Sequence, residues 1–134
     1  MKNISTTLLL LISLSVFSQS GIKKYDIEQS IYRIKDDKGK WKYESMDANK
    51  LFKFVVDQNE KKIYVNWMMF DIFTIVESHE AYKKDERYIY EYLCTDIEGN
   101  NCVIVLEKYG EDVIEANIDY DNFQVIFSLK DSQL

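Results

Sequence analysis

The sequence predicts an all-β fold, an antiparallel up-and-down meander of about eight or nine short strands that forms a closed or half-open barrel. Three observations support this prediction: short apolar–polar alternations, glycines placed in the polar breaks between them, and the absence of proline. No segment is long enough for the helical crossover that parallel strands require. Because such a sheet must hide one apolar face, it either closes on itself or folds over, so a two-sheet β-sandwich is the alternative.

The predicted strands alternate with short turns. In chain order they cover residues 30–36, 40–46, 51–56, 62–67, 70–77, 87–95, 101–108, 113–120 and 123–129. The breaks DDKGK and DIEGN each predict a type I turn with glycine at the left-handed bulge position. Residues 70–77 favour a strand, although the apolar run VNWMMFDIFTIV also fits a helix. The polar residues 78–87 predict the longest loop or a single helical turn.

The turns also set the register of the last four strands. A two-residue turn at Asp121-Asn122 pairs apolar residues on one face: Tyr120 with Phe123, Ile118 with Val125, Ala116 with Phe127, and Ile114 with Leu129. The bulged DIEGN turn pairs Cys94 with Cys102, Tyr92 with Ile104, and Tyr90 with Leu106. A slip of one residue would expose every one of these side chains. The two apolar faces must therefore merge, and we expect Leu106 near Ile114 and Ile104 near Ala116.

Residues 1–20 have the pattern of a signal peptide. Lys2 precedes an apolar run from Leu8 to Phe17, and small residues then allow cleavage before Gln19 or Gly21. The run is too short to span a bilayer, and no cysteine follows it for lipid anchoring. We therefore expect residues 21–134 to form a single β domain in the periplasm or outside the cell.

The charge balance narrows the classes of partner. The chain carries 17 Lys and Arg against 23 Asp and Glu, a net charge of −6. An acidic protein repels phosphate backbones, so nucleic acid is not an expected partner. Membrane insertion is not expected either, because charged residues interrupt both faces of the predicted strands.

The two cysteines of the chain, Cys94 and Cys102, are predicted to form a disulfide. An even cysteine count in an exported chain favours a bridge, and the register independently places the two residues opposite each other. Two buried free thiols are the alternative. No CxxC motif is present, so the pair is interpreted as structural rather than redox-active.

Two groups of side chains on the predicted sheet are candidate binding surfaces. Tyr88, Tyr90 and Tyr92 share one face at a spacing of two and could hold a sugar or a small amphipathic molecule, with packing in the core as the alternative. The opposite face carries an apolar patch suited to a protein partner or to a second interior: Ile89, Leu93, Val103 and Val105. In the first hairpin, Lys35 and Arg33 are expected to form cation–π pairs with Trp41 and Tyr43.

The chain lacks the motifs of common catalytic sites. Asp71 lies within the apolar run WMMFDIF. It is interpreted either as an acid–base group or as a residue at a bend or bulge where the chain returns to solvent. His79 is the single histidine, too few nitrogen ligands for a zinc site, and residues 119–122 lack the spacing of a calcium loop. No nucleophile motif or phosphate-binding glycine loop is present, so neither a catalytic residue nor a cofactor is predicted.

These observations favour two functional hypotheses. The first is a non-enzymatic binding module that holds a small amphipathic ligand or a glycan on the tyrosine-lined face. The second is a protein-interaction module, such as an inhibitor, a surface component or an accessory subunit, that uses the apolar patch. An enzyme built around Asp71 would require a cleft in which Asp71 lies beside a second titratable group.

Overall fold

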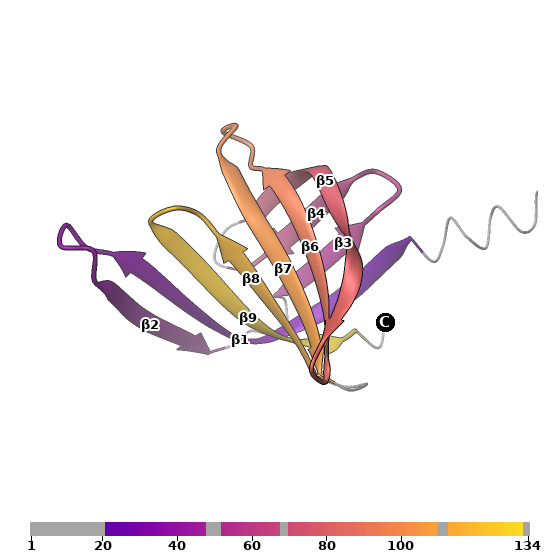
Figure 1. The fold of residues 1–134 in the computed structure, drawn as a ribbon, viewed down its shortest axis with the longest axis horizontal. Helices are drawn as coiled ribbons and strands as arrows, with labels where there is room; N and C mark the ends of the chain where they lie inside the picture. Colours follow the sequence, from indigo (N-terminus) through magenta and orange to yellow (C-terminus); the bar gives the residue numbers. More distant parts are fainter. Residues whose placement is uncertain (1–20, 48–51, 68–69, 110–112, 133–134) are drawn as a thin grey trace, which may run out of the picture.

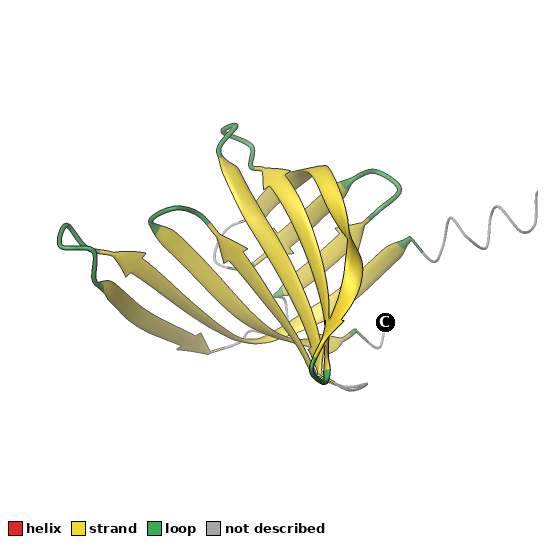
Figure 2. Cartoon of the chain, viewed as in Figure 1, coloured by secondary structure: helices red, strands yellow, loops and turns green. Residues whose placement is uncertain are grey.

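The computed structural model describes residues 21–47, 52–67, 70–109 and 113–132. The predicted signal peptide and Gly110, which lies in the break between the predicted strands 101–108 and 113–120, are outside these ranges. The described residues form nine strands: β1 (Ile22–Lys35), β2 (Trp41–Asp47), β3 (Lys53–Asp57), β4 (Lys62–Asn66), β5 (Phe70–Lys84), β6 (Arg87–Thr95), β7 (Asn101–Tyr109), β8 (Val113–Asp119) and β9 (Phe123–Asp131). Short turns join β1 to β2, β3 to β4, β5 to β6, β6 to β7 and β8 to β9, and the described ranges contain no helix (Figure 2). Within those ranges there is accordingly no helix that could cross a membrane.

The strands close into an eight-stranded antiparallel barrel with one additional strand, β2. From β3 to β9 each strand pairs with the next along the chain, and β9 pairs back with β1 (Figure 1). This last ladder extends from Ile34 opposite Phe123 to Tyr25 opposite Asp131. Closure satisfies the edges of the sheet and hides its apolar face. The predicted all-β barrel is therefore confirmed over the sandwich alternative.

Strand β1 has two successive partners along one edge. Residues 22–26 pair with β3, whereas residues 29–35 pair with β2. A β-bulge between Ile27 and Gln29 in the β1–β9 ladder lies where the partner changes. Because a bulge bends its strand and increases the local twist, the β1–β2 hairpin projects away from β3 and β4 (Figure 1).

The bulge in β1 also explains why the sequence prediction began this strand too late. The inward-facing residues are Tyr25, Ile27, Ser30 and Tyr32, so their spacing changes from two to three at the bulge. A search for strict two-residue alternation detects only the second half. The strand begins at Ile22 rather than at Ser30.

Strand β5 corrects the prediction for residues 78–87. These residues were expected to form a loop or a helical turn, but β5 continues to Lys84 and only Asp85 and Glu86 separate it from β6. Asp85 adopts a positive φ of 58°, as a two-residue hairpin turn requires. The second half of β5 is exposed on both faces, and register shifts occur at Ile75/Glu77 and His79/Tyr82. Because this half of β5 is exposed to solvent and bulged, its sequence is as polar as that of a loop and lacks a regular apolar alternation. The helical alternative for the preceding apolar run is also wrong.

The two predicted glycine turns are confirmed. Gly39 and Gly99 have φ values of 80° and 85°. In the second turn the Gly99 N–H donates to the Asp96 carbonyl at 3.0 Å, and the Asp96 N–H donates to the Asn100 carbonyl at 3.0 Å. The first turn repeats both bonds, at 3.0 Å and 2.8 Å, between Gly39, Asp36 and Lys40. A side chain at either glycine would force a strained backbone.

The predicted pairings within the last two hairpins are confirmed, including Tyr92 with Ile104 and Ala116 with Phe127. The link between β7 and β8 differs by two residues, because Leu106 lies opposite Ala116 and Ile104 lies opposite Ile118. A shift of two preserves the side-chain parity. The two apolar faces therefore merge as predicted, although the individual neighbours differ.

Side chains fill the middle of the barrel. The Trp67 ring meets the Phe127 ring edge-on at 5.3 Å, and the Phe54 and Phe127 rings lie 6.0 Å apart. Phe54, Phe127, Ile63, Ile104 and Val65 are fully buried. Each large apolar side chain contributes about 1.5–3 kcal/mol when buried. An eight-stranded barrel is just wide enough for such packing, so room for a ligand is found at its ends.

The disulfide prediction is corrected. Cys94 and Cys102 are buried opposite each other, as the register predicted, but the structure holds both as free thiols. In an antiparallel ladder, hydrogen-bonded and non-hydrogen-bonded residue pairs alternate. Asp96 and Asn100 form a hydrogen-bonded pair, so Cys94 and Cys102, two positions along the ladder, form a hydrogen-bonded pair as well. At such positions the strands are farther apart than at the intervening ones. A disulfide needs Cβ atoms about 3.8 Å apart. Two cysteines that lie opposite each other in the register are therefore not always close enough to form one.

We predict that both thiols are inert in the folded protein. Burial raises the pKa of Cys94 to about 12 and that of Cys102 to about 11, so the reactive thiolate is scarce at neutral pH. A thiol-specific reagent at pH 7.5 should label neither cysteine in the native protein and both after denaturation. A denatured, unreduced sample in which no cysteine reacts would show that the bridge forms after all.

Candidate functional site

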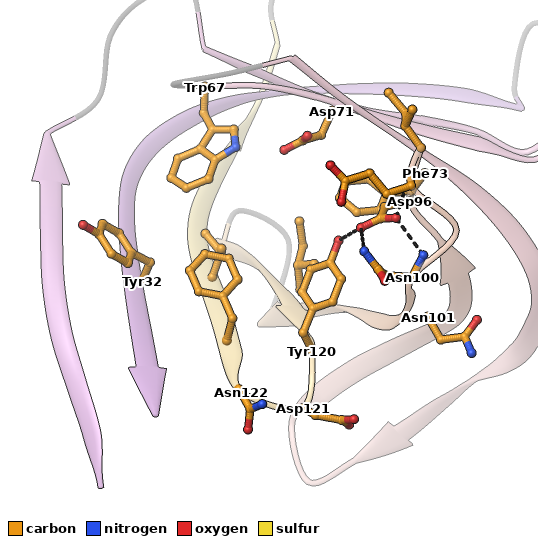
Figure 3. Close-up of a pocket in the computed structure, with 15 residues that line it drawn as sticks. Tyr32, Trp67, Asp71, Phe73, Asp96, Asn100, Asn101, Tyr120, Asp121 and Asn122 are labelled. Carbon is orange, nitrogen blue, oxygen red and sulfur yellow. Dashed lines mark hydrogen bonds between the residues drawn. The ribbon is translucent and has the colours of Figure 1, made fainter. Parts of the chain in front are cut away.

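A cavity of about 930 Å³ opens at one end of the barrel. Three parts of the chain converge there: Trp67 directly after β4, the β6–β7 turn and the β8–β9 turn (Figure 3). In an up-and-down meander alternate connections lie at the same end of the sheet, which explains why segments far apart in sequence meet. We call this site the mouth cavity.

An aromatic wall lines much of the mouth cavity. The ring of Phe123 lies 6.1 Å from that of Tyr32 and 6.2 Å from that of Tyr120, so β1, the β8–β9 turn and β9 contribute to one continuous surface. These three side chains are half-buried, whereas Trp67 and Phe73 are buried deeper, at 8% and 2% exposure. The aliphatic members of the lining are Ile97, Ile118 and Val125.

Asp96 organises the β6–β7 turn at the rim. Its Oδ1 accepts backbone N–H bonds from Glu98 at 3.0 Å and Asn100 at 2.8 Å, and its Oδ2 accepts the Tyr120 hydroxyl at 2.9 Å. Partial burial opposes ionisation, but these hydrogen bonds outweigh it and lower the pKa of Asp96. Burial and the bond to this carboxylate raise the pKa of Tyr120. A fixed, ionised carboxylate thus holds the Tyr120 ring in the aromatic wall.

Tyr32 connects the wall to the additional strand. Its hydroxyl donates to the Glu44 carboxylate on β2. On the same hairpin, the Arg33 guanidinium lies 4.5 Å from the Trp41 ring centre and 5.8 Å from that of Tyr43, and the Lys35 ammonium lies 5.8 Å from the Trp41 ring centre. The predicted cation–π pairs are therefore confirmed, and they engage the cations of β1 nearest the mouth.

The tyrosine ladder does not line the mouth cavity. Tyr92 is a core residue at 4% exposure, and its hydroxyl accepts a bond from Gln58 Nε2 at 3.3 Å. Tyr90 is half-buried and lines a smaller cavity of about 380 Å³ at the other end of the barrel, together with Tyr25. Tyr88 is 45% exposed, with the Lys83 ammonium 5.9 Å from its ring centre. The three tyrosines on this face of β6 thus extend from the core at Tyr92 to solvent at Tyr88.

The proposed partner patch is largely covered. Ile89 is only 5% exposed, and Leu93, Val103 and Val105 are half-buried. Leu93 lies opposite Val103 on the outer surface, where the patch residues alternate with Glu91 and Glu107 in the paired strands. The large apolar side chains with the greatest exposure are elsewhere, with Ile97 at 70% and Val76 at 69%.

Asp71 and His79, the two residues considered as reactive groups, lie in different environments. Asp71 is half-buried and lines the mouth cavity near Trp67 and Asp96 (Figure 3). His79 is exposed on β5, 3.6 Å from a Glu77 oxygen and 3.7 Å from a Glu91 oxygen. Among the described residues no cluster of three or more His, Cys, Asp or Glu could hold a metal ion. Residues 121 and 122 form the two-residue turn predicted for them.

Sequence reasoning missed most of the mouth cavity. Trp67, Tyr120 and Phe123 were interpreted only as ends of strands, and Asp96 only as a turn residue. Their common location could have been inferred from hairpin parity, because the turns after β4, β6 and β8 must share one end. The depth of the cavity depends on the curvature of the closed barrel, for which no local sequence signal exists.

Substitution of Asp96 should reveal its role through the pH dependence of stability. A pKa lowered by folding stabilises the native state above the unfolded value, near 3.9, and this contribution disappears as the pH falls through the native value. We expect Asp96→Asn to lower the free energy of unfolding at pH 7 by about 1–2 kcal/mol. In urea titrations the difference from the unmodified protein should shrink between pH 5 and pH 2.

The matched control for this prediction is Tyr120→Phe, which removes one hydrogen bond to Asp96 and keeps both the ring and the turn. It should cost less stability at pH 7 than Asp96→Asn. A deficit of Asp96→Asn that stays the same from pH 7 to pH 2 would contradict the assigned role of the carboxylate.

Comparisons of this chain with models of protein families, with curated proteins and with solved structures find no match.

Proposed function

We propose that the protein is an exported, non-enzymatic binding module that holds one small amphipathic molecule in the mouth cavity. The observation that carries this proposal is the combination of a half-buried aromatic wall with a polar rim in a single cavity. Small-molecule sites combine a mostly apolar lining with a few placed polar groups in the same way. Export follows from the signal-peptide pattern of residues 1–20.

The size of the mouth cavity supports a small ligand. About 930 Å³ falls within the range of roughly 300–1,000 Å³ that is usual for such sites. Trp67 and Phe73 limit its depth, because the core below them is filled. A ligand would therefore place its apolar part against the Tyr32–Phe123–Tyr120 wall and keep its polar part at the rim.

The catalytic hypothesis required Asp71 to lie in a cleft beside a second titratable group, and Asp96 and Tyr120 do share the mouth cavity with it. A pair of carboxylates acts as acid and base when one of them stays protonated near the working pH. Asp96 is instead held ionised by the turn, and Tyr120 is held protonated. Both groups are already engaged in hydrogen bonds with the turn or with each other, which favours a structural role for them over proton transfer.

The protein-interaction hypothesis is less well supported. It needs an accessible apolar surface on β6 and β7, but Ile89 is buried and its three companions are half-buried. The mouth cavity instead presents a concave, half-buried aromatic surface. Such a surface suits a small molecule better than the flat surface of a protein partner.

Trp67 offers a direct test. Trp41→Phe leaves Trp67 as the single tryptophan of the chain, so its fluorescence reports on the mouth cavity. Octyl glucoside, a neutral amphipath, should change this fluorescence saturably at concentrations below its micelle threshold. Phe123→Ala in the same background removes the centre of the aromatic wall and should weaken binding by about 5- to 30-fold, corresponding to about 1–2 kcal/mol.

Tyr88→Ala is the matched control, since it also removes an exposed aromatic ring but lies outside the cavity. It should bind octyl glucoside with unchanged affinity. Equal losses in the two variants, or no loss in Phe123→Ala while thermal melts show a folded protein, would refute the placement of the site.

A further inference from the structure

The charges around the mouth cavity have one sign. Four carboxylates line it: Asp71, Asp96, Glu98 and Asp121. Among the residues that the structure describes, no Lys, Arg or His belongs to this lining. The cavity at the other end of the barrel is different, because Lys23, Lys24 and Lys108 line it alongside Glu107 and Asp131. The acidic character is therefore a property of the mouth and not only of the whole chain.

The roles of the four carboxylates differ. Asp96 is ionised but already accepts bonds from the turn and from Tyr120. Glu98 and Asp121 are exposed at the turn tips. Asp71 is half-buried, and among the described residues no hydrogen bond or ion pair engages its side chain. It is thus the carboxylate of the cavity lining that is both sheltered and available to a ligand.

Cations of β1 and β4 are engaged on other surfaces. Arg33 and Lys35 lie over Trp41 in the projecting hairpin, and the Lys62 ammonium donates to Thr74 Oγ1 at 2.7 Å. None of the three lines the mouth cavity. A cationic group that enters the cavity would therefore meet Asp71 without competition from these side chains.

Figure 3 shows the Asp71 carboxylate between Trp67 on one side and Phe73 and Asp96 on the other. A carboxylate beside aromatic rings is suited to an ammonium group, since the rings attract a cation through their electron-rich faces and the carboxylate neutralises it. An anionic head group would be repelled by the same side chains.

We propose that the ligand of the mouth cavity is a cationic amphipath, whose amine or quaternary ammonium group is held by Asp71 and whose apolar part contacts the aromatic wall. This inference rests on the proposed function and specifies its ligand class. The acidic rim attracts such molecules, and the filled core limits them to a short apolar chain or a single ring system.

Three ligands with the same eight-carbon chain separate the possibilities. Octyltrimethylammonium, octyl glucoside and octyl sulfate would each be titrated into the Trp41→Phe protein, below their micelle thresholds and at about 0.15 M salt, with Trp67 fluorescence and calorimetry as readouts. The cation should bind about tenfold or more tightly than the glucoside, and the sulfate should bind most weakly. Higher salt should weaken binding of the cation and leave that of the glucoside unchanged.

The role of Asp71 is tested by Asp71→Asn, which should reduce the affinity for octyltrimethylammonium by about tenfold and leave octyl glucoside binding intact. Asp131→Asn removes the same charge at the other end of the barrel and should change neither affinity. If Asp71→Asn does not fold, the comparison of the three ligands on the Trp41→Phe protein still decides the ligand class.

The two proposals fail in different ways. Saturable binding of the glucoside with no preference for the cation would overturn the inference and leave the proposed function standing. A preference for the cation that survives in folded Asp71→Asn would overturn the role of Asp71. If none of the three ligands binds, the proposed function fails together with the inference.

Discussion

The ladder between β1 and β9 is the interaction on which the rest of the structure depends. It joins the first and last strands of the described chain, from Tyr25 opposite Asp131 to Ile34 opposite Phe123. Without it the remaining strands would form an open sheet with one apolar face in water. With it, that face becomes the core around Phe54 and Phe127, and Trp67, the β6–β7 turn and the β8–β9 turn lie around one opening. The mouth cavity is thus a consequence of closure.

The pairing of β7 with β8 explains why polar turn chemistry and the aromatic wall are coupled. Asp96 stabilises its own turn through backbone N–H bonds, as many hairpin aspartates do. Because Val103 on β7 lies opposite Asp119 on β8, the β8–β9 turn is close enough for Tyr120 to donate to the same carboxylate. A local turn residue thereby fixes an aromatic ring contributed by another hairpin.

The sequence was sufficient to predict those parts of the fold that depend on local chemistry. The DDKGK and DIEGN turns and the pairing of Tyr92 with Ile104 follow from glycine geometry and two-residue alternation. The predictions failed where a bulge interrupts that alternation, as between Ile27 and Gln29 in β1 and within the exposed half of β5. They also failed for the cysteines, because the register specifies which residues face each other and not how far apart they stand. Of the candidate site only Asp71 was singled out, since the other lining residues come from segments that lie far apart in the sequence.

The additional strand β2 has a further consequence. On the described residues it pairs with β1 alone, so one of its edges offers backbone hydrogen-bonding groups to the surroundings. Exposed edges of this type recruit other strands and initiate aggregation. Along β2 the exposed Lys42 and Glu44 flank the exposed Tyr43, and charged side chains on an edge strand disfavour the addition of a foreign strand. The charged residues of β2 thus protect its open edge against aggregation. The closed part of the barrel needs no such protection, because its strands are paired on both sides.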